Sequence, residues 1–572
     1  MDLELSTIQE DLEVGETLTC EFKSDYRGKL ELSKIVETVV GMANTQGGVL
    51  YIGIEDNGVV TGIKHLKKYL VNTTILMADI QKNTMPPVFT TVSVYESPDY
   101  DVLCVSVKKG IDICSTTQGK VLKRIISTDG KPATVPMYPY EQQSRRVDLG
   151  LLDYSAQRVE GTSFDDLNPL EFERLRQTIK RRNGDQSLLE LSDEEFCKAL
   201  NLVETVGNDL VPTVAGLLLL GRDEVIRRHF PTNMVNFQVL DRKADVRVNE
   251  GLTGPLVRIL EKAESFIVPR IEESEAIIGI FRYPIPNYDR TGLREAVNNA
   301  VLHRDYISVG QVYIQWYPDH ILITNPGGFP EGITKDNILV HEPHPRNVRL
   351  AEAFLRIGII EKTGRGVDKI YLGQVMYGRA PPDFSRSDAT GVRVIIPGGG
   401  ASHAFARFVF EEDKKGEAFN LDQLLVMATL YHDREMTSQA AGVLIQKGPD
   451  EGRRVLENLH DRGLVEGKGR GRGRVYMLSH GLYKRLNMET EYERRRGIDP
   501  VRHEQMILQY IEDNGSITRR VAADLCQIEP YAAGYVLKRM VEKNPDLRLE
   551  GTRRWARYVL SDDDSEPESS DS

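Results

Sequence analysis

Near the start of the chain, hydrophobic residues follow first a helical and then an extended period. The segment LELSKIVETVVGMANT (30–45) places apolar side chains at helical spacing, whereas GGVLYIGIEDNG is a short apolar run closed by an Asp-Asn-Gly turn. The segments TTVSVYES and DVLCVSVKKG then follow the two-residue period of strands. These patterns predict an α/β domain over residues 1–146.

A similar pattern returns after residue 285. A helix is followed by QVYIQWYPDHILITN, in which two strand-like runs flank a Pro-Asp-His turn, and later by a helix and the strand GVRVIIP. We expect a second α/β domain over residues 285–400. Residues 147–284 mix helices with the strand candidate MVNFQVLDR and contain no chemical motif, so we interpret them as a connector.

The last part of the chain contains one small arrangement twice. After the glycine-rich boundary PGGGAS, residues 416–482 and 500–561 each contain three helical segments followed by a hairpin. That order and length are typical of a winged helix-turn-helix. We therefore expect a multidomain α/β plus α+β protein, with two winged helices before an acidic, disordered tail at 562–572.

Length and composition narrow the class of protein. A chain of 572 residues is too long for one core, and no apolar run approaches the roughly 18 to 20 residues of a membrane-spanning helix. The acidic N-terminus has the pattern of neither a signal peptide nor a transit peptide, so we expect a cytoplasmic protein without a membrane partner. Five scattered cysteines without a C-x-x-C pair indicate buried or free thiols.

The formal net charge of -12 counts against nucleic-acid binding unless positive charge is concentrated locally. Charges are screened over about 10 Å, so their distribution matters more than their sum. Basic clusters at 468–474 and 553–557 suit contact with a phosphate backbone. For the first cluster the alternative is a solvated hairpin. For the second, the alternative is that Trp555 belongs to the hydrophobic core. The residues expected to contact nucleic acid are Lys468, Arg470, Arg472, Arg474, Arg553 and Arg554.

The segment REAVNNAVLHRDY (294–306) carries candidate chemistry. On a helix Val297 and Val301 share an apolar face, while Glu295 and Asn299 lie on the opposite side at i, i+4 spacing. Two adjacent asparagines are unfavourable inside a helix, which indicates a requirement beyond folding. A carboxylate and an amide oxygen over one surface point suit an attacking water and a hydrated Mg²⁺ ion. The alternative is a solvated polar face.

Two glycine-rich turns follow, TNPGGFPEG after a strand and EKTGRGVDKI before a helix. The second places backbone N–H groups at a helix N-terminus, where phosphates are favoured. The ordered set of a Glu-x-x-x-Asn helix, two strands and two glycine turns resembles the GHKL ATPase superfamily, in the branch related to the RecG helicase C-terminus. The resemblance implies an α/β sandwich that binds ATP, with Glu295 as general base, Asn299 as Mg²⁺ ligand, and Gly364 and Gly366 in the phosphate loop.

One position departs from that family. The first glycine box, with Gly327, has Asn325 where the family usually has an aspartate that accepts the adenine amino group. An amide oxygen still accepts, without charge, so the sequence supports ATP binding more than hydrolysis, and the enzymatic expectation is a weak ATPase. A motor helicase is not expected, because no G-x-x-x-x-G-K-[ST] motif occurs in the chain.

The N-terminal segment GETLTCEFKSDY contains Glu16, Glu21 and Lys23. On an extended strand Glu21 and Lys23 share a face, and a surface salt bridge on an edge strand is one interpretation. Together with ANTQGGVLYIGIEDNGVVTGI and the later Arg124, the segment closely resembles the Schlafen AlbA-like domain, over roughly residues 12–140.

That resemblance implies a second site. In nuclease members of the family, acidic residues at the positions of Glu16, Glu21 and one near Asp56 form a metal-dependent phosphodiesterase site. Three carboxylates there would hold Mg²⁺ or Mn²⁺, with Lys23 stabilising the developing charge. The same Glu-Phe-Lys core occurs in regulatory members, and spacing leaves Glu55 and Asp56 both open as the third carboxylate.

Two functions fit these observations. The first is an ATP-binding, nucleic-acid-binding regulator, a DNA-binding transcriptional or defence factor with an AlbA-like module. The second is a metal-dependent Schlafen-type endoribonuclease gated by ATP. DNA and RNA both stay open as partners, and the two families often dimerise, so a homodimer or higher oligomer fits either function.

Overall fold

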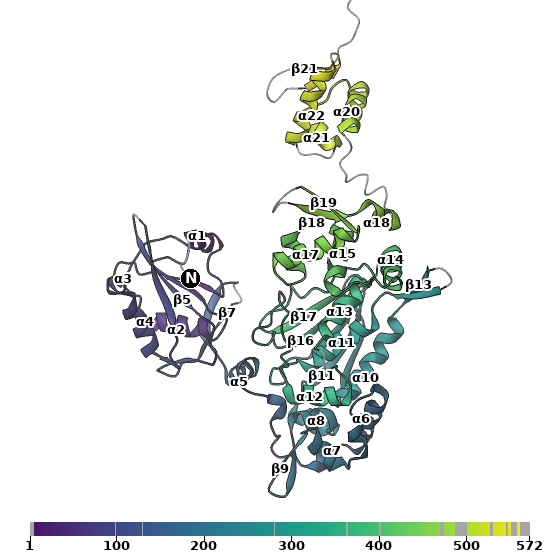
Figure 1. Ribbon diagram of the computed structural model, residues 1–572. Helices are drawn as coiled ribbons and strands as arrows, with labels where there is room; N and C mark the ends of the chain where they lie inside the picture. The colour runs from purple at the N-terminus through teal and green to yellow at the C-terminus, as the bar shows by residue number, and fades with distance from the viewer. Residues whose placement is uncertain are drawn as a thin grey trace, which may run out of the picture. The chain divides into compact units, whose positions relative to one another are not determined.

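The computed structural model divides the chain into two compact units (Figure 1). The first contains Met1–Glu275 and Pro284–Ala401, and the second contains Ala276–Tyr283 and Ser402–Ser572. Helices accompany small sheets in both units, so the fold class is multidomain α/β plus α+β, as the sequence predicts. The structure describes residues 5–97, 99–127, 130–278, 281–361, 364–399, 402–433, 435–469, 474–486, 500–526, 530–544, 547–550 and 557–560.

A four-stranded sheet organises the N-terminal domain. β1 (Cys20–Lys23) runs parallel to β2 (Gly48–Ile52), which pairs antiparallel with β5 (Asp101–Val107), and β5 pairs antiparallel with β4 (Thr90–Glu96). Leu50 of β2 joins one hydrophobic cluster, whereas its neighbour Tyr51 joins the cluster on the opposite face. The two-residue period of strands therefore buries this sheet on both sides.

Helices supply the apolar side chains that meet these faces. α2 (Leu32–Ala43) and α4 (Thr73–Lys82) pack on one face, and α1 (Leu5–Val14) contributes to the other. The helix and strands predicted for residues 30–107 are confirmed. The remaining elements are α3 (Lys67–Val71), β3 (Thr84–Met85), β6 (Ser115–Thr116), the hairpin β7 (Leu122–Ile126) and β8 (Pro132–Pro136), and α5 (Pro139–Asp148).

A mixed sheet in the order β12-β11-β15-β16-β17 organises the second half of this unit. β15 (Val312–Trp316), β16 (His320–Pro326) and β17 (Gly391–Pro397) are the strands expected from the sequence. β11 (Met234–Leu240) and β12 (Val246–Thr253) come from the range interpreted as a connector, and β11 pairs in parallel with β15. The sheet therefore begins upstream of residue 285, because β11 finds its partner strand far along the chain.

Three helices pack beside this sheet: α10 (Leu256–Ile267), α11 (Arg290–Leu302) and α13 (Gly366–Val375) (Figure 1). α11 contacts β15 and β16 of the sheet and also α13, so it is enclosed by both. The other elements of the unit are η1 (Tyr154–Ala156), η2 (Phe164–Asp166), α6 (Pro169–Arg182), η3 (Gln186–Glu190), α7 (Asp193–Ala199), β9 (Val203–Val206), β10 (Asp209–Pro212), α8 (Val214–Leu220), α9 (Asp223–His229), η4 (Val268–Arg270) and α12 (Val348–Ile357). A hairpin of β13 (Glu273–Ile278) and β14 (Phe281–Pro286) is shared between the two units.

The second unit contains the repeated order of helices and hairpin that the sequence predicts. Its first part comprises α14 (His403–Lys414), α15 (Leu421–Asp433), β18 (Met436–Thr437), α16 (Ser438–Leu444), α17 (Pro449–Asp461), β19 (Val465–Lys468), β20 (Val475–Leu478) and α18 (His480–Arg485). The second comprises α20 (Pro500–Asn514), α21 (Arg519–Cys526), α22 (Pro530–Lys543), β21 (Leu547–Glu550) and β22 (Arg557–Leu560), with its own hydrophobic core. The acidic tail at 562–572 lies outside the described residues.

All five cysteines are buried and unpaired. Burial raises the pKa of the Cys20, Cys104 and Cys114 thiols to about 12, because the thiolate loses its hydration. Within the described ranges, no helix is both long enough and apolar enough to cross a bilayer.

Candidate functional site

α11 is fixed by its cap and by its apolar face. Asp289 accepts a hydrogen bond from the Gly292 amide at 2.6 Å, which satisfies one of the free N–H groups of the first turn. Val297 and Val301 are buried, as the helical spacing predicts. The opposite side of the helix is thereby held toward α13.

Glu295 and Asn299 lie beneath the first residue of α13. A Cβ atom on Gly366 would lie 3.1 Å from Glu295 Oε2 and 3.6 Å from Asn299 Nδ2. Glu295 is buried by this packing rather than solvated. Asn298 has a different role, because its side chain donates to the Ile359 carbonyl at 3.2 Å inside the protein. Only one of the two adjacent asparagines therefore faces the candidate site.

A cavity of about 370 Å³ opens at this point, within the size range of small-molecule sites. Five residues that the sequence marks for a nucleotide site line it, although they come from separate segments of the chain. They are Glu295, Asn299, Asn325, Gly364 and Gly366.

The rest of the lining is largely apolar. Phe329, Phe384, Val392 and Val394 contribute to it, and Asn325 of β16 is buried with 5% of its surface exposed. A cavity that combines carboxylate, amide and glycine N–H groups with an apolar surface suits a ligand that has both a charged and a flat apolar part.

Gly327 does not line the cavity, whereas its neighbour Gly328 does. Gly327 has a positive φ of 90°, and a Cβ there would lie 2.8 Å from Asp305 Cβ and 3.0 Å from Arg346 Cζ. Its lack of a side chain is a packing requirement of the turn. Within the glycine turn TNPGGFPEG, sequence reasoning singled out Gly327 rather than Gly328, because spacing does not distinguish the two glycines. It missed Arg346, because none of the motifs described above contains that residue.

Burial shifts the ionisation of the acidic group in the cavity. It raises the pKa of Glu295, and the nearby cations Lys369 and Arg294 offset this in part. A carboxylate with a raised pKa can take a proton from a water molecule more readily than an exposed one. Asn299 offers one amide oxygen to a cation, which fits Mg²⁺ because that ion completes its coordination with phosphates and water.

The residues that follow α11 mostly hold its end in place. Arg304 donates to the Gly310 carbonyl at 2.6 Å, and Asp305 accepts from the Ile307 amide at 2.9 Å. His303 instead lines the cavity, and burial lowers its pKa to about 4.

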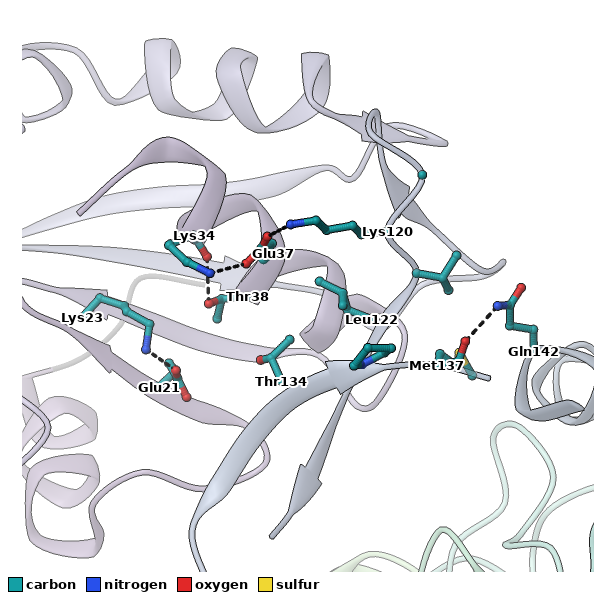
Figure 2. A pocket seen from close by; sticks show the side chains of 13 residues that line it. Glu21, Lys23, Lys34, Glu37, Thr38, Lys120, Leu122, Thr134, Met137 and Gln142 are labelled. Atoms are coloured by element: carbon teal, nitrogen blue, oxygen red, sulfur yellow. Dashed lines mark hydrogen bonds and ion pairs between the residues drawn. The ribbon is translucent and has the colours of Figure 1, made fainter. Parts of the chain in front are cut away.

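The N-terminal domain has a second cavity of about 680 Å³, shown in Figure 2. Glu37 of α2 lies between Lys34 at 2.9 Å and Lys120 at 2.5 Å. Glu21 and Lys23 of β1 form an ion pair on the same wall. Each of these three lysines therefore has a carboxylate partner at the opening.

Glu21 is neutralised from two sides. Besides Lys23, it contacts Arg124, whose Nη1 lies 2.6 Å from Glu21 Oε2 and whose side chain is fully buried. Arg124 also donates to the Leu18 and Thr17 carbonyls, which fixes its guanidinium in place. The carboxylate thus has a permanent cationic partner within the domain.

The other expected metal ligands lie in the same region as Glu21, since the charges of Glu21 and Asp56 both contribute to raising the pKa of Glu16. Glu16 accepts from the Phe22 amide at 3.0 Å, and burial raises its pKa. Asp56 is exposed, and Glu55 accepts hydrogen bonds from Ser24 at 2.5 Å and Thr61 at 2.9 Å. In the part of the chain that the structure describes, no three His, Cys, Asp or Glu residues are placed to hold a metal ion. The arrangement as it stands does not fit a three-carboxylate metal centre.

The basic hairpins are described only in part. Lys468 is exposed at the end of β19, and Arg474 stacks over Tyr476 with 4.9 Å between guanidinium carbon and ring centre. Arg470, Arg472, Arg553, Arg554 and Trp555 lie outside the described residues. On α17, Arg453 and Arg454 pair with acidic residues of the same helix.

Comparison with protein families assigns three regions. Residues 16–133 match the family described as "Schlafen, AlbA_2", and residues 310–396 match "Putative ATP-dependent DNA helicase recG C-terminal". Residues 150–236 match a "Domain of unknown function (DUF8451)". The Schlafen AlbA_2 match contains Glu16, Glu21, Lys23 and Asp56, whereas the recG C-terminal match begins after α11.

Comparison with whole proteins adds little. No curated protein matches the chain. Among solved structures, the DIP2311 protein from Corynebacterium diphtheriae is similar at 20% identity and a TM-score of 0.48, over 84% of this chain and 98% of that one.

Proposed function

Because the chain joins a Schlafen AlbA_2 domain to an ATPase-like domain of the recG C-terminal type, we propose that it is an ATP-binding, nucleic-acid-binding regulator. These two domain families together indicate a nucleic-acid-related, ATP-binding protein. The observation that carries the proposal is the cavity that gathers Glu295, Asn299, Asn325 and Gly366.

Each of these residues has a separate task in nucleotide binding. Asn299 would hold Mg²⁺ through its amide oxygen, and the N-terminus of α13 at Gly366 would present backbone N–H groups to the phosphates. Glu295 would accept a proton from water if the nucleotide is hydrolysed. Asn325 contacts the base among apolar side chains.

Nucleic acid is bound by the N-terminal domain and by the two C-terminal units, which act as winged helices on DNA. Glu21 forms ion pairs with both Lys23 and Arg124. We take this as support for a regulatory function over metal-dependent RNA cleavage. Two cationic partners offset the negative charge that Glu21 would offer a metal ion, which weakens its attraction for a cation.

Calorimetry with Mg-ATP tests the nucleotide site. Asn299→Ala should weaken binding at least tenfold, because a contact to a charged group contributes about 1.5 to 3 kcal/mol. Asn249→Ala, an exposed asparagine on β12, is the matched control and should bind like the parent protein. Equal affinity in all three proteins would reject the proposed site.

A cleavage assay separates the regulator from the nuclease. Full-length protein is incubated with labelled structured RNA or duplex DNA, with Mg²⁺ or Mn²⁺, with and without ATP, beside Glu21→Ala. We expect retention of nucleic acid without cleavage. Cleavage that disappears in Glu21→Ala would replace the regulator with an ATP-gated endoribonuclease.

A further inference from the structure

α5 lies between β8 of the N-terminal domain and the rest of its unit, and its first half belongs to the N-terminal cavity. Gln142 lines that cavity and donates to the Met137 carbonyl at 2.9 Å (Figure 2). Glu141 forms an ion pair with Lys123 of the β7–β8 hairpin. A shift of this end of α5 would therefore alter one wall of the cavity.

The second half of α5 contacts the ATPase-like region. Ser144 Oγ donates to Asp305 Oδ2 at 2.7 Å, and Arg145 Nη1 lies 3.0 Å from Glu331 Oε2. Asp148 forms an ion pair with Arg346. Three successive polar contacts thus run along about one and a half turns of the helix.

Asp305 and Arg346 in turn hold the glycine turn at the edge of the nucleotide cavity. The Asp305 amide donates to the Pro326 carbonyl at 2.9 Å, and Arg346 Nη2 donates to the Gly328 carbonyl at 2.6 Å. Gly328 itself lines the cavity. α5 is therefore linked to the Pro326 end of the turn through Asp305 and to the Gly328 end through Arg346. A ligand in the cavity would touch this turn at Gly328.

Burial makes these contacts obligatory. The Arg346 side chain has 1% of its surface exposed, and Asp305 is buried as well. Removing one partner of a buried ion pair leaves an uncompensated charge, which is strongly unfavourable. Undocking of α5 would therefore leave the two residues that hold the glycine turn, Asp305 and Arg346, without their partners on α5.

We propose that Arg346 and Asp305 are positioning residues of the nucleotide cavity, and that α5, which anchors both, transmits nucleotide occupancy to the N-terminal cavity. This inference rests on nucleotide binding as proposed above. If a bound nucleotide stabilises the docked arrangement of α5, then docking of α5 must raise the affinity for the nucleotide by the same factor.

Hydrogen exchange of the full-length protein tests the proposal, with and without saturating Mg²⁺ and a non-hydrolysable ATP analogue. In the parent protein the analogue should slow amide exchange across 137–148 at least fivefold, within the usual range of coupling. In the Ser144→Ala, Arg145→Ala double variant the analogue should slow amide exchange across 137–148 less than twofold. Calorimetry should still show that this variant binds the analogue. Arg146→Ala is the control, because it removes one positive charge from an exposed position of α5. In this variant the analogue should slow amide exchange as much as in the parent protein.

The positioning role has its own readout. Arg346→Lys keeps the buried charge but not the two-pronged contact to Gly328 and Asp148, so we expect weaker nucleotide binding by about tenfold with a melting temperature close to that of the parent. Unchanged nucleotide affinity in Arg346→Lys would overturn the positioning role. Binding of the analogue by the parent without any change in exchange over 137–148, or an equal loss of response in Arg146→Ala, would overturn the transmission by α5. Absence of analogue binding to the parent protein would instead reject the proposed nucleotide site.

Discussion

Glu295 and His303 line the same cavity, and burial shifts their ionisation in opposite directions. It raises the pKa of Glu295 and lowers the pKa of His303 to about 4. Each group is thereby moved toward its neutral form, since a desolvated charge is unfavourable. Near neutral pH, His303 enters the cavity as a neutral imidazole beside the cation of Arg346.

This shift predicts a loss of stability in acid. The unfolded chain takes up a proton on His303 near its ordinary pKa of 6.5, whereas the folded protein resists protonation until about pH 4. The stabilisation is therefore complete above pH 6.5 and is lost as the pH falls toward 4, and about 2 kcal/mol of it has been lost by pH 5. In His303→Gln the drop in melting temperature between pH 7 and pH 5 should be smaller by about 3 °C.

An exposed histidine provides the control for that comparison. His403→Gln, at the start of α14, should show the same drop as the parent protein. An identical drop in His303→Gln would mean that other groups carry the acid sensitivity of this unit.

At the scale of elements, the turn at 326–328 depends on a residue without a side chain. Gly327 combines a φ of 90° with close neighbours in Asp305 and Arg346, so Ala there meets both backbone strain and a steric clash. Gly161 has a φ of 76° and nothing within 4 Å of its Cβ position. Substitution of Gly161 therefore tests backbone strain alone, whereas substitution of Gly327 tests strain together with a steric clash.

Gly327→Ala should therefore weaken nucleotide binding at least tenfold and destabilise the protein by about 2 to 4 kcal/mol, of which backbone strain accounts for about 1 to 3 kcal/mol. Gly161→Ala should cost only about 1 kcal/mol and leave affinity unchanged. Denaturation and calorimetry on both variants check this. If the two variants behaved alike, the contacts of Gly327 with Asp305 and Arg346 would have no energetic importance.

Elements whose information is local were predictable from the sequence. The apolar spacing of α11, the short apolar runs of β2 and β5 and the alternation of β16 specify those elements without knowledge of partners. The pairing of Glu295 with Asn299 follows from helical geometry alone. The gathering of Asn325 with these residues was anticipated only through resemblance, because β16 joins them by tertiary packing.

Features that depend on distant partners were not predictable in this way. β11 has strand character in the sequence, but β12, three helices and a hairpin lie between it and its parallel partner β15 along the chain. The link from Asp148 to Arg346 and from Arg124 to Glu21 likewise joins residues that no periodicity relates. The pairing of Glu21 with Lys23, two residues apart on one strand, was therefore predictable from the sequence, whereas the pairing of Glu21 with Arg124 was not.

At the scale of the whole molecule, the proposed binding of nucleic acid would depend on local rather than net charge. The chain carries a formal charge of -12, so a polyanion is repelled on average and held only where cations are concentrated. Lys468 is exposed on β19 without an acidic partner among its described neighbours, unlike the paired arginines of α17.

Salt dependence should report that contribution. If Lys468 contacts a phosphate, Lys468→Ala should reduce the slope of log affinity against log salt by about 1 for duplex DNA. Lys484→Ala, exposed on α18, changes the same charge in the same unit and should leave the slope unchanged. Equal slopes for the parent and both variants would place nucleic-acid binding away from this hairpin.

The burial of all five thiols makes cysteine reactivity a measure of domain opening. Cys20, Cys104 and Cys114 report on the N-terminal domain, Cys197 on α7 and Cys526 on α21. Because the reactive form is the thiolate and burial raises the pKa of each thiol, modification should proceed only during transient unfolding. Mass spectrometry of the native protein after brief alkylation would therefore rank its regions by how often each one unfolds, without any introduced label.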